Sequence, residues 1–61
     1  MDDLSTRHEK LMADASDCDL IANQSESPAA RETFRRIANK LRKDAAGVEV
    51  VLKIRLKQAV Q

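Results

Sequence analysis

The chain has 61 residues, of which 11 are Lys or Arg and 10 are Asp or Glu, so its formal net charge is +1. A chain this short forms at most one small domain, 1–61, which rarely buries enough apolar surface without a disulfide, a metal or oligomerisation. The single cysteine, Cys18, excludes an internal disulfide. With one His, ten residues away, it supplies too few ligands for tetrahedral zinc, so we expect a homo-oligomer or a complex with another protein chain.

The sequence does not indicate a membrane span or secretion. No run approaches the roughly 18 consecutive apolar residues that a membrane span needs. The first residues, MDDLSTRHEK, are acidic and polar and lack the basic region and apolar core of a signal peptide. A lone cysteine fits a reducing compartment, so we expect a cytoplasmic protein.

The first predicted helix covers residues 4–24. Its apolar and small side chains recur at alternating steps of four and three residues, which is typical of a helix that packs along another helix. This row consists of Leu4, His8, Leu11, Ala15, Cys18, Ala22 and Ser25. Leu20 falls on the far side of the helix, where it is either exposed or part of a second interface.

A turn at residues 25–27 separates the two predicted helices. Ser27 suits the N-cap, and Pro28 suits the first helical position because the nitrogen there needs no hydrogen. The second helix is predicted over 28–46, with an apolar face made of Ala30, Phe34, Ile37, Ala38, Leu41, Ala45 and Val48. A link this short makes the helices antiparallel. The sequence therefore predicts an all-α antiparallel two-helix hairpin that assembles into a dimeric helical bundle, as in a coiled coil.

The tail, residues 47–61, fits two different structures. From Val48 to Leu56 every second residue is apolar, and this alternation with β-branched side chains favours a strand. A strand would have no partner within the chain, whereas the residues after it are good helix formers. We therefore favour a helix that continues past Gly47, extended or kinked there, over a strand or disordered segment that waits for a partner. Either way the tail has more apolar side chains than a hairpin can cover, and the candidate interface is Leu20, Val48, Val50, Val51, Leu52, Ile54 and Leu56.

Charge is divided unevenly between the halves of the chain. Residues 1–30 hold seven acids and two bases, a net −5, and residues 31–61 hold nine bases and three acids, a net +6. The main interpretation is an acidic helix beside a basic one, with exposed charges that set pairing and orientation. The alternative is a nucleic-acid or other anion contact, for which the candidates are Arg31, Arg35, Arg42 and Lys43. The absence of Tyr and Trp for stacking on bases argues against nucleic acid.

No residue pattern indicates catalysis or a cofactor. His8 falls in the apolar row of the first helix, and a catalytic triad would need a nucleophile and an orienting carboxylate in a defined pocket. Cys18 lies between Asp17 and Asp19, whose charges make a thiolate less favourable, so we interpret it as a small packing residue. The nearby acids lack the alternating ligands and glycine of a calcium loop. We expect no enzyme activity, no cofactor, no bound metal and no small-molecule substrate.

Residues 8–49 combine an Ala-rich helix, a turn with Pro three residues before Arg, and a helix with a large apolar residue followed by an Ile-Ala pair. The residues that carry this pattern are Pro28, Arg31, Phe34, Ile37, Ala38 and Leu41. In this respect the chain resembles a type of short helical-hairpin protein found in alphaproteobacteria. The resemblance implies an α-hairpin of unknown biochemical function, implies no catalytic residues, and does not extend to the tail.

These observations predict a small non-enzymatic helical protein that acts through protein–protein association, either with itself, as a homodimer, or as an adaptor or regulator of another chain. One alternative is a nucleic-acid-binding regulator that uses the basic side of the second helix. The other is an antitoxin-like chain whose C-terminal tail folds on a partner.

Overall fold

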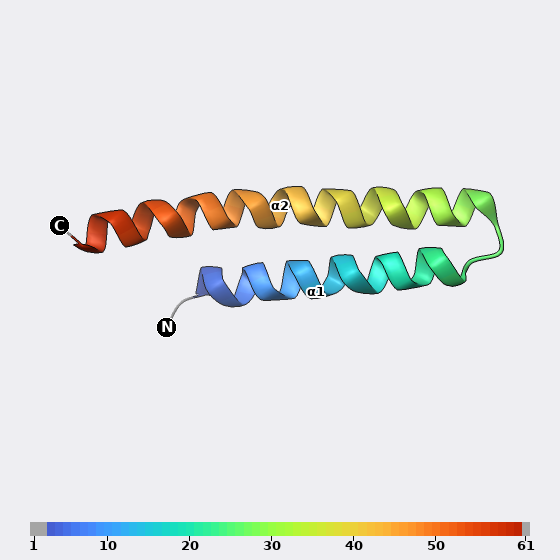
Figure 1. Cartoon of the computed structure of the whole chain (residues 1–61), viewed down its shortest axis with the longest axis horizontal. Coiled ribbons are helices and arrows are strands. Elements are labelled where there is room, and N and C mark those ends of the chain that lie inside the picture. Colours follow the sequence, from blue (N-terminus) through green and yellow to red (C-terminus); the bar gives the residue numbers. More distant parts are fainter. Residues whose placement is uncertain (1–2, 61) are drawn as a thin grey trace.

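The computed structural model describes residues 3–60, and side-chain surroundings are described up to residue 58. Two helices make up this part of the chain: α1, Asp3–Gln24, and α2, Pro28–Val60. They run antiparallel and pack side by side along the whole of α1 (Figure 1). The predicted all-α hairpin is confirmed. Neither helix contains, within the described residues, a stretch long and apolar enough to cross a membrane.

Side-chain and backbone hydrogen bonds fix the turn between the helices. The Ser27 side chain accepts a bond from the backbone nitrogen of Ala30 at 3.4 Å, as an N-cap does. At the end of α1, the Ser25 hydroxyl donates to the carbonyl oxygen of Ile21 at 2.8 Å. Arg31 then links both sides of the turn, because its Nε donates to the Ser25 carbonyl oxygen at 2.6 Å. Groups that a helix end leaves unpaired are thus partly satisfied by the turn itself.

The buried side chains of the described hairpin are all alanines. Among the described side chains, only Ala15 and Ala22 of α1 and Ala38 and Ala45 of α2 are buried, each at most 1% exposed. In each helix the two alanines are seven residues apart, about two turns, so they lie on one side of the helix. A methyl group at these positions lets the two backbones approach closely. Larger apolar side chains beside them, such as Phe34 and Leu41, are only half-buried.

The predicted packing faces are largely correct, with one exception. Every residue predicted for the row of α1 is buried or half-buried, but Ile37 of α2 is exposed (43%). Ile37 lies one residue, or about 100°, from the buried Ala38 on the helix circumference. A helix covers only one side of its neighbour, so a side chain at this angle stays at the edge of the contact.

The tail is helical. α2 continues without interruption through Gly47 to Val60, so the strand and the disordered segment that we considered for residues 48–58 are wrong. Gly47 does not have a positive φ, and its presence in a helix costs only about 1 kcal/mol relative to Ala. A strand needs a neighbour for its backbone bonds, whereas a helix satisfies them within itself. Glu49 and Lys53, 3.3 Å apart at i,i+4, add support on the surface.

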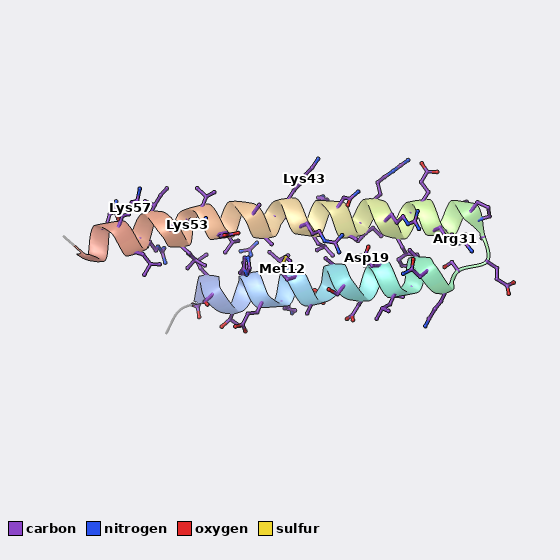
Figure 2. The ribbon with its side chains drawn as sticks, in the orientation of Figure 1. Met12, Asp19, Arg31, Lys43, Lys53 and Lys57 are labelled. Atoms are coloured by element: carbon purple, nitrogen blue, oxygen red, sulfur yellow. The ribbon has the colours of Figure 1, made fainter. Side chains whose placement is uncertain are left out.

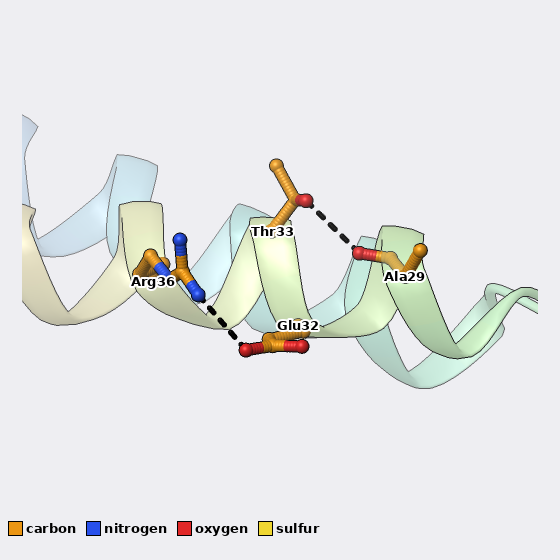
Figure 3. A network of polar contacts seen from close by, with 4 residues as sticks. All are labelled: Ala29, Glu32, Thr33 and Arg36. Carbon is orange, nitrogen blue, oxygen red and sulfur yellow. Dashed lines mark hydrogen bonds and ion pairs between the residues drawn. The ribbon is translucent and has the colours of Figure 1, made fainter.

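Exposed polar contacts also support the first turns of α2 (Figure 3). Arg36 Nη2 donates to Glu32 Oε1 at 2.9 Å, and the Thr33 hydroxyl donates to the Ala29 carbonyl oxygen, also at 2.9 Å. Both partners of the ion pair are more than two-thirds exposed, so such a pair stabilises the helix by about 0.3–0.5 kcal/mol. These contacts favour helix formation and have little influence on how the helices pack.

The helices differ in length, which leaves one end of α2 without a neighbour. α2 has 33 residues and α1 has 22, a difference of eleven. At a rise of 1.5 Å per residue, α2 extends beyond α1 by about 16 Å. Figure 1 shows this free end of α2 beyond the start of α1, on the side away from the turn.

Replacement of a buried alanine by a larger residue should push the helices apart. We expect Ala15→Leu to lower the free energy of unfolding by about 1–3 kcal/mol, because a larger side chain overpacks a fully buried position. Urea denaturation followed by circular dichroism measures the change. Ala13→Leu is the matched control, since Ala13 is exposed on the same helix. Equal stability of the two variants would show that the alanine contact does not set the helix spacing.

Candidate functional site

The candidate site is the C-terminal segment of α2, defined here as residues 47–58. Most of its apolar side chains face solvent: Val50 is 56% exposed, Ile54 50% and Leu56 66%. Val51 is exposed as well, whereas Val48 and Leu52 are half-buried at the edge of the contact with α1. Val50, Val51 and Ile54 are exposed because they lie on the side of α2 turned away from the buried Ala38 and Ala45. Leu56 is exposed because α2 extends past the start of α1.

Apolar side chains occupy two opposite sides of this segment, and the charged Glu49, Lys53 and Lys57 share one flank between them. By helical spacing, Leu52 and Leu56 continue the side of α2 that packs against α1 farther back along the helix. Val50, Val51 and Ile54 occupy the opposite side, together with Gly47. A helix with apolar side chains on opposite sides normally packs against other helices on both sides. Within the described residues, the side with Val50 and Ile54 is exposed.

A groove adjoins the segment where α1 begins. It is open to solvent, has a volume of about 400 Å³ and lies between the two helices. Its lining consists of Leu4, Arg7 and Leu11 from α1 and Lys43, Asp44, Gly47, Val48 and Val51 from α2. Apolar walls with charged residues among them are typical of a surface that binds another helix.

The far side of α1 offers one more exposed apolar side chain. Leu20, also predicted as an interface residue, is 57% exposed. It belongs to α1 near the turn, whereas the C-terminal segment lies toward the opposite end of α1, beside its first turns and past them. The structure therefore does not bring Leu20 together with the other six candidates.

The four predicted anion-binding residues have different surroundings. Arg42 is half-buried and its Nη2 contacts Asp19 Oδ2 on α1, while Arg31 donates to the turn as described above. Arg35 and Lys43 are exposed. Figure 2 shows Lys43 extending away from α1 and Asp19 between the helices. Two of the four cations are therefore engaged within the hairpin, which weakens a nucleic-acid surface on this side.

The contact between Asp19 and Arg42 is the ion pair that joins the acidic helix to the basic one. The hydrogen bond from Arg42 lowers the pKa of Asp19, outweighs the effect of desolvation, and is assisted by the charges of Arg42 and Arg35. The same hydrogen bond raises the pKa of Arg42. The sequence suggested attraction between the two helices, but it did not identify this pair.

The other candidate groups for chemistry are separated. His8 and Cys18 are both half-buried along the row of α1 that faces α2, ten residues and thus about 15 Å apart along the helix axis. In the described part of the chain, no cluster of three or more His, Cys, Asp or Glu side chains is arranged to hold a metal ion.

Comparisons with models of protein families, with curated proteins and with solved structures found no match to this chain. The site is therefore defined by its own residues. Sequence reasoning missed the groove and the place of Gly47 in it. The sequence did contain a signal for an apolar side that includes Gly47. The spacing of Gly47, Val50, Val51 and Ile54 puts all four residues on one side of a helix.

The ion pair predicts a pH dependence of stability. Because the pKa of Asp19 is lower in the folded than in the unfolded chain, its contribution is present above the ordinary aspartate pKa of about 4 and disappears as pH falls through the lowered value. We expect Asp19→Asn to be less stable than wild type at pH 7 and to lose less stability on acidification. Urea midpoints at pH 7 and pH 3 measure this difference.

Asp17→Asn is the control, since it removes the same charge from an exposed position of α1. Should the two variants change stability with pH in the same way, the contact between Asp19 and Arg42 would have no specific role.

Proposed function

We propose that this protein is non-enzymatic and acts through helix-mediated protein–protein association, with the C-terminal segment of α2 as its binding surface. The observation that carries the proposal is the exposure of Val50, Val51, Ile54 and Leu56, four large apolar side chains on one short helical segment. Exposed apolar clusters of this kind mark interaction sites in small proteins. The partner is either a second copy of the chain or another protein for which this chain is an adaptor or regulator.

The energetics favour a partner. Full burial of a Val, Leu or Ile side chain contributes about 1.5–3 kcal/mol, so four half-exposed side chains can contribute on the order of 4 kcal/mol from one side of an interface. A partner surface of similar composition would contribute a comparable amount. Together these terms begin to offset the loss of translational and rotational freedom on binding.

The same association would stabilise the fold. No described side chain larger than alanine is fully buried, so the hairpin alone has little apolar burial to offset its conformational entropy. A partner that binds only the folded chain shifts the folding equilibrium by mass action. Folding and binding are thus linked in this proposal.

Nucleic-acid binding is less well supported than protein binding. Arg42 and Arg31 already make contacts inside the hairpin, although Arg31 is exposed, and Arg35 and Lys43 are the exposed members of the predicted set for which no such contact is described. Cytoplasmic location is part of our proposal, because the free thiol of Cys18 suits a reducing compartment.

Photo-crosslinking tests the binding surface. With a photoreactive amino acid at position 54, we expect covalent adducts with a protein partner in cells that express the chain, because Ile54 lies on the exposed side of the segment. Position 37 is the matched control: it also holds an exposed isoleucine of α2, but lies outside the segment. Denaturing electrophoresis and mass spectrometry measure adduct yield and mass.

A yield at position 54 that does not exceed the yield at position 37 would remove the segment as the binding surface. An adduct of twice the chain mass identifies a second copy as the partner, and any other mass identifies a different protein.

A further inference from the structure

We infer that the C-terminal segment of α2 pairs antiparallel with the same segment of a second copy of this chain, and that Gly47 of each copy accommodates Ile54 of the other. This inference rests on the proposed function and specifies its partner. It depends on three observations: a glycine that the hairpin does not require, a symmetrical spacing of apolar residues, and a pair of opposite charges on one flank.

Nothing within the described chain requires a glycine at position 47. It lies inside a 33-residue helix, does not have a positive φ, and is exposed. A Cβ built at this position would meet no heavy atom within 4 Å outside its own helical surroundings, so alanine would fit without any change. Glycine is nevertheless a poorer helix former than alanine. A glycine is required here if the backbone or a bulky side chain of another molecule packs closely against this position.

The residues around Gly47 form a row with two-fold symmetry. The row consists of Gly47, Val50, Val51 and Ile54, at steps of three, one and three residues. This spacing is the same in both directions about its midpoint, although the residue types differ. On a helix these positions share one side, turned away from the buried Ala38 and Ala45. All four are exposed.

Antiparallel pairing of two such rows about their midpoint matches large residues with small ones. Ile54 of one copy then lies opposite Gly47 of the other, and Val50 lies opposite Val51 of the other copy. Both copies use the same residues in this contact, so the dimer has two-fold symmetry. Neither copy then has a free contact surface to which a third copy could add to form a filament. Gly47 and Val51 also line the groove, so the second helix covers the edge of the groove as well.

Charge on the groove side of the row favours the same register. With Gly47 opposite Ile54 of the other copy, Asp44 lies within two residues, or about 3 Å along the axis, of Arg55 of that copy. Both side chains are exposed and on the same flank of the row, so the pair forms twice in the dimer. On the other flank, Lys43 lies near Lys57 of the second copy, which opposes pairing at low salt.

The contact is small. Two helical turns from each copy bury much less than the roughly 1,600 Å² of a standard stable interface, so we expect a reversible dimer that dissociates on dilution.

Sedimentation equilibrium over a dilution series tests the pairing with the full chain. We expect wild type to dimerise, Gly47→Ala to raise the dissociation constant at least fivefold, and Gly47→Leu to abolish dimerisation. Thermal unfolding of the dilute protein should show the opposite trend for Gly47→Ala, which should melt higher than wild type because alanine is the better helix former. A merely structural role for Gly47 cannot give these opposite effects.

Two further variants distinguish an effect on the pairing of the two copies from an effect on helix stability. Lys43→Glu should lower the dissociation constant at low salt, because it replaces repulsion from Lys57 with attraction. Asn39→Ala is the matched control: it improves helix propensity at an exposed position of α2 outside the row, and should raise the melting temperature without a change in dimerisation.

A wild-type chain that stays monomeric at several hundred micromolar would overturn the pairing, as would a Gly47→Ala variant that dimerises as well as wild type. In either case a crosslink from position 54 to a different protein would leave the proposed function intact. Absence of any specific crosslink there would remove the proposed function itself.

Discussion

A buried core made of alanine alone limits most other properties of this hairpin. Among the described side chains, only Ala15, Ala22, Ala38 and Ala45 are buried. Every larger described apolar side chain stays at least partly in solvent: Ile37 is exposed, and Phe34 and Leu41 are half-buried. A core of this kind gives precise alignment with little hydrophobic stabilisation.

The small buried core and the uncovered end of α2 both favour the binding of a partner. The chain lacks apolar burial in its own contact, and it presents apolar side chains where α2 extends past α1. Any partner on that end adds the burial that the hairpin lacks. Charge helps to align the two helices, because the ion pair of Asp19 with Arg42 links the acidic helix α1 to the basic helix α2. Exposed pairs such as Glu32 with Arg36 mainly support the individual helix.

The sequence was sufficient to predict the helices, the turn and the face of α1 that packs, because alternating steps of three and four residues depend only on helix geometry. It was ambiguous for the tail, where apolar residues at every second position also occur on a helix that has apolar side chains on opposite sides. The position of Ile37 was predicted wrongly, since spacing alone does not reveal how closely two helices approach. The contact of Asp19 with Arg42 and the groove beside Gly47 depend on the relative alignment of the helices along their axes, which no local pattern contains.

The unequal helix lengths also give the hairpin two ends with different accessibility. α1 begins and α2 finishes toward one end, so the start of α1 lies beside the exposed apolar segment, whereas the turn at residues 25–27 lies at the far end of a body 52 Å long. A domain fused to either terminus would stand next to the exposed apolar segment and compete with the proposed partner for it. The turn, with exposed Glu26 between two capped helices, is the place where a fluorophore, a surface tether or an inserted peptide leaves that surface open.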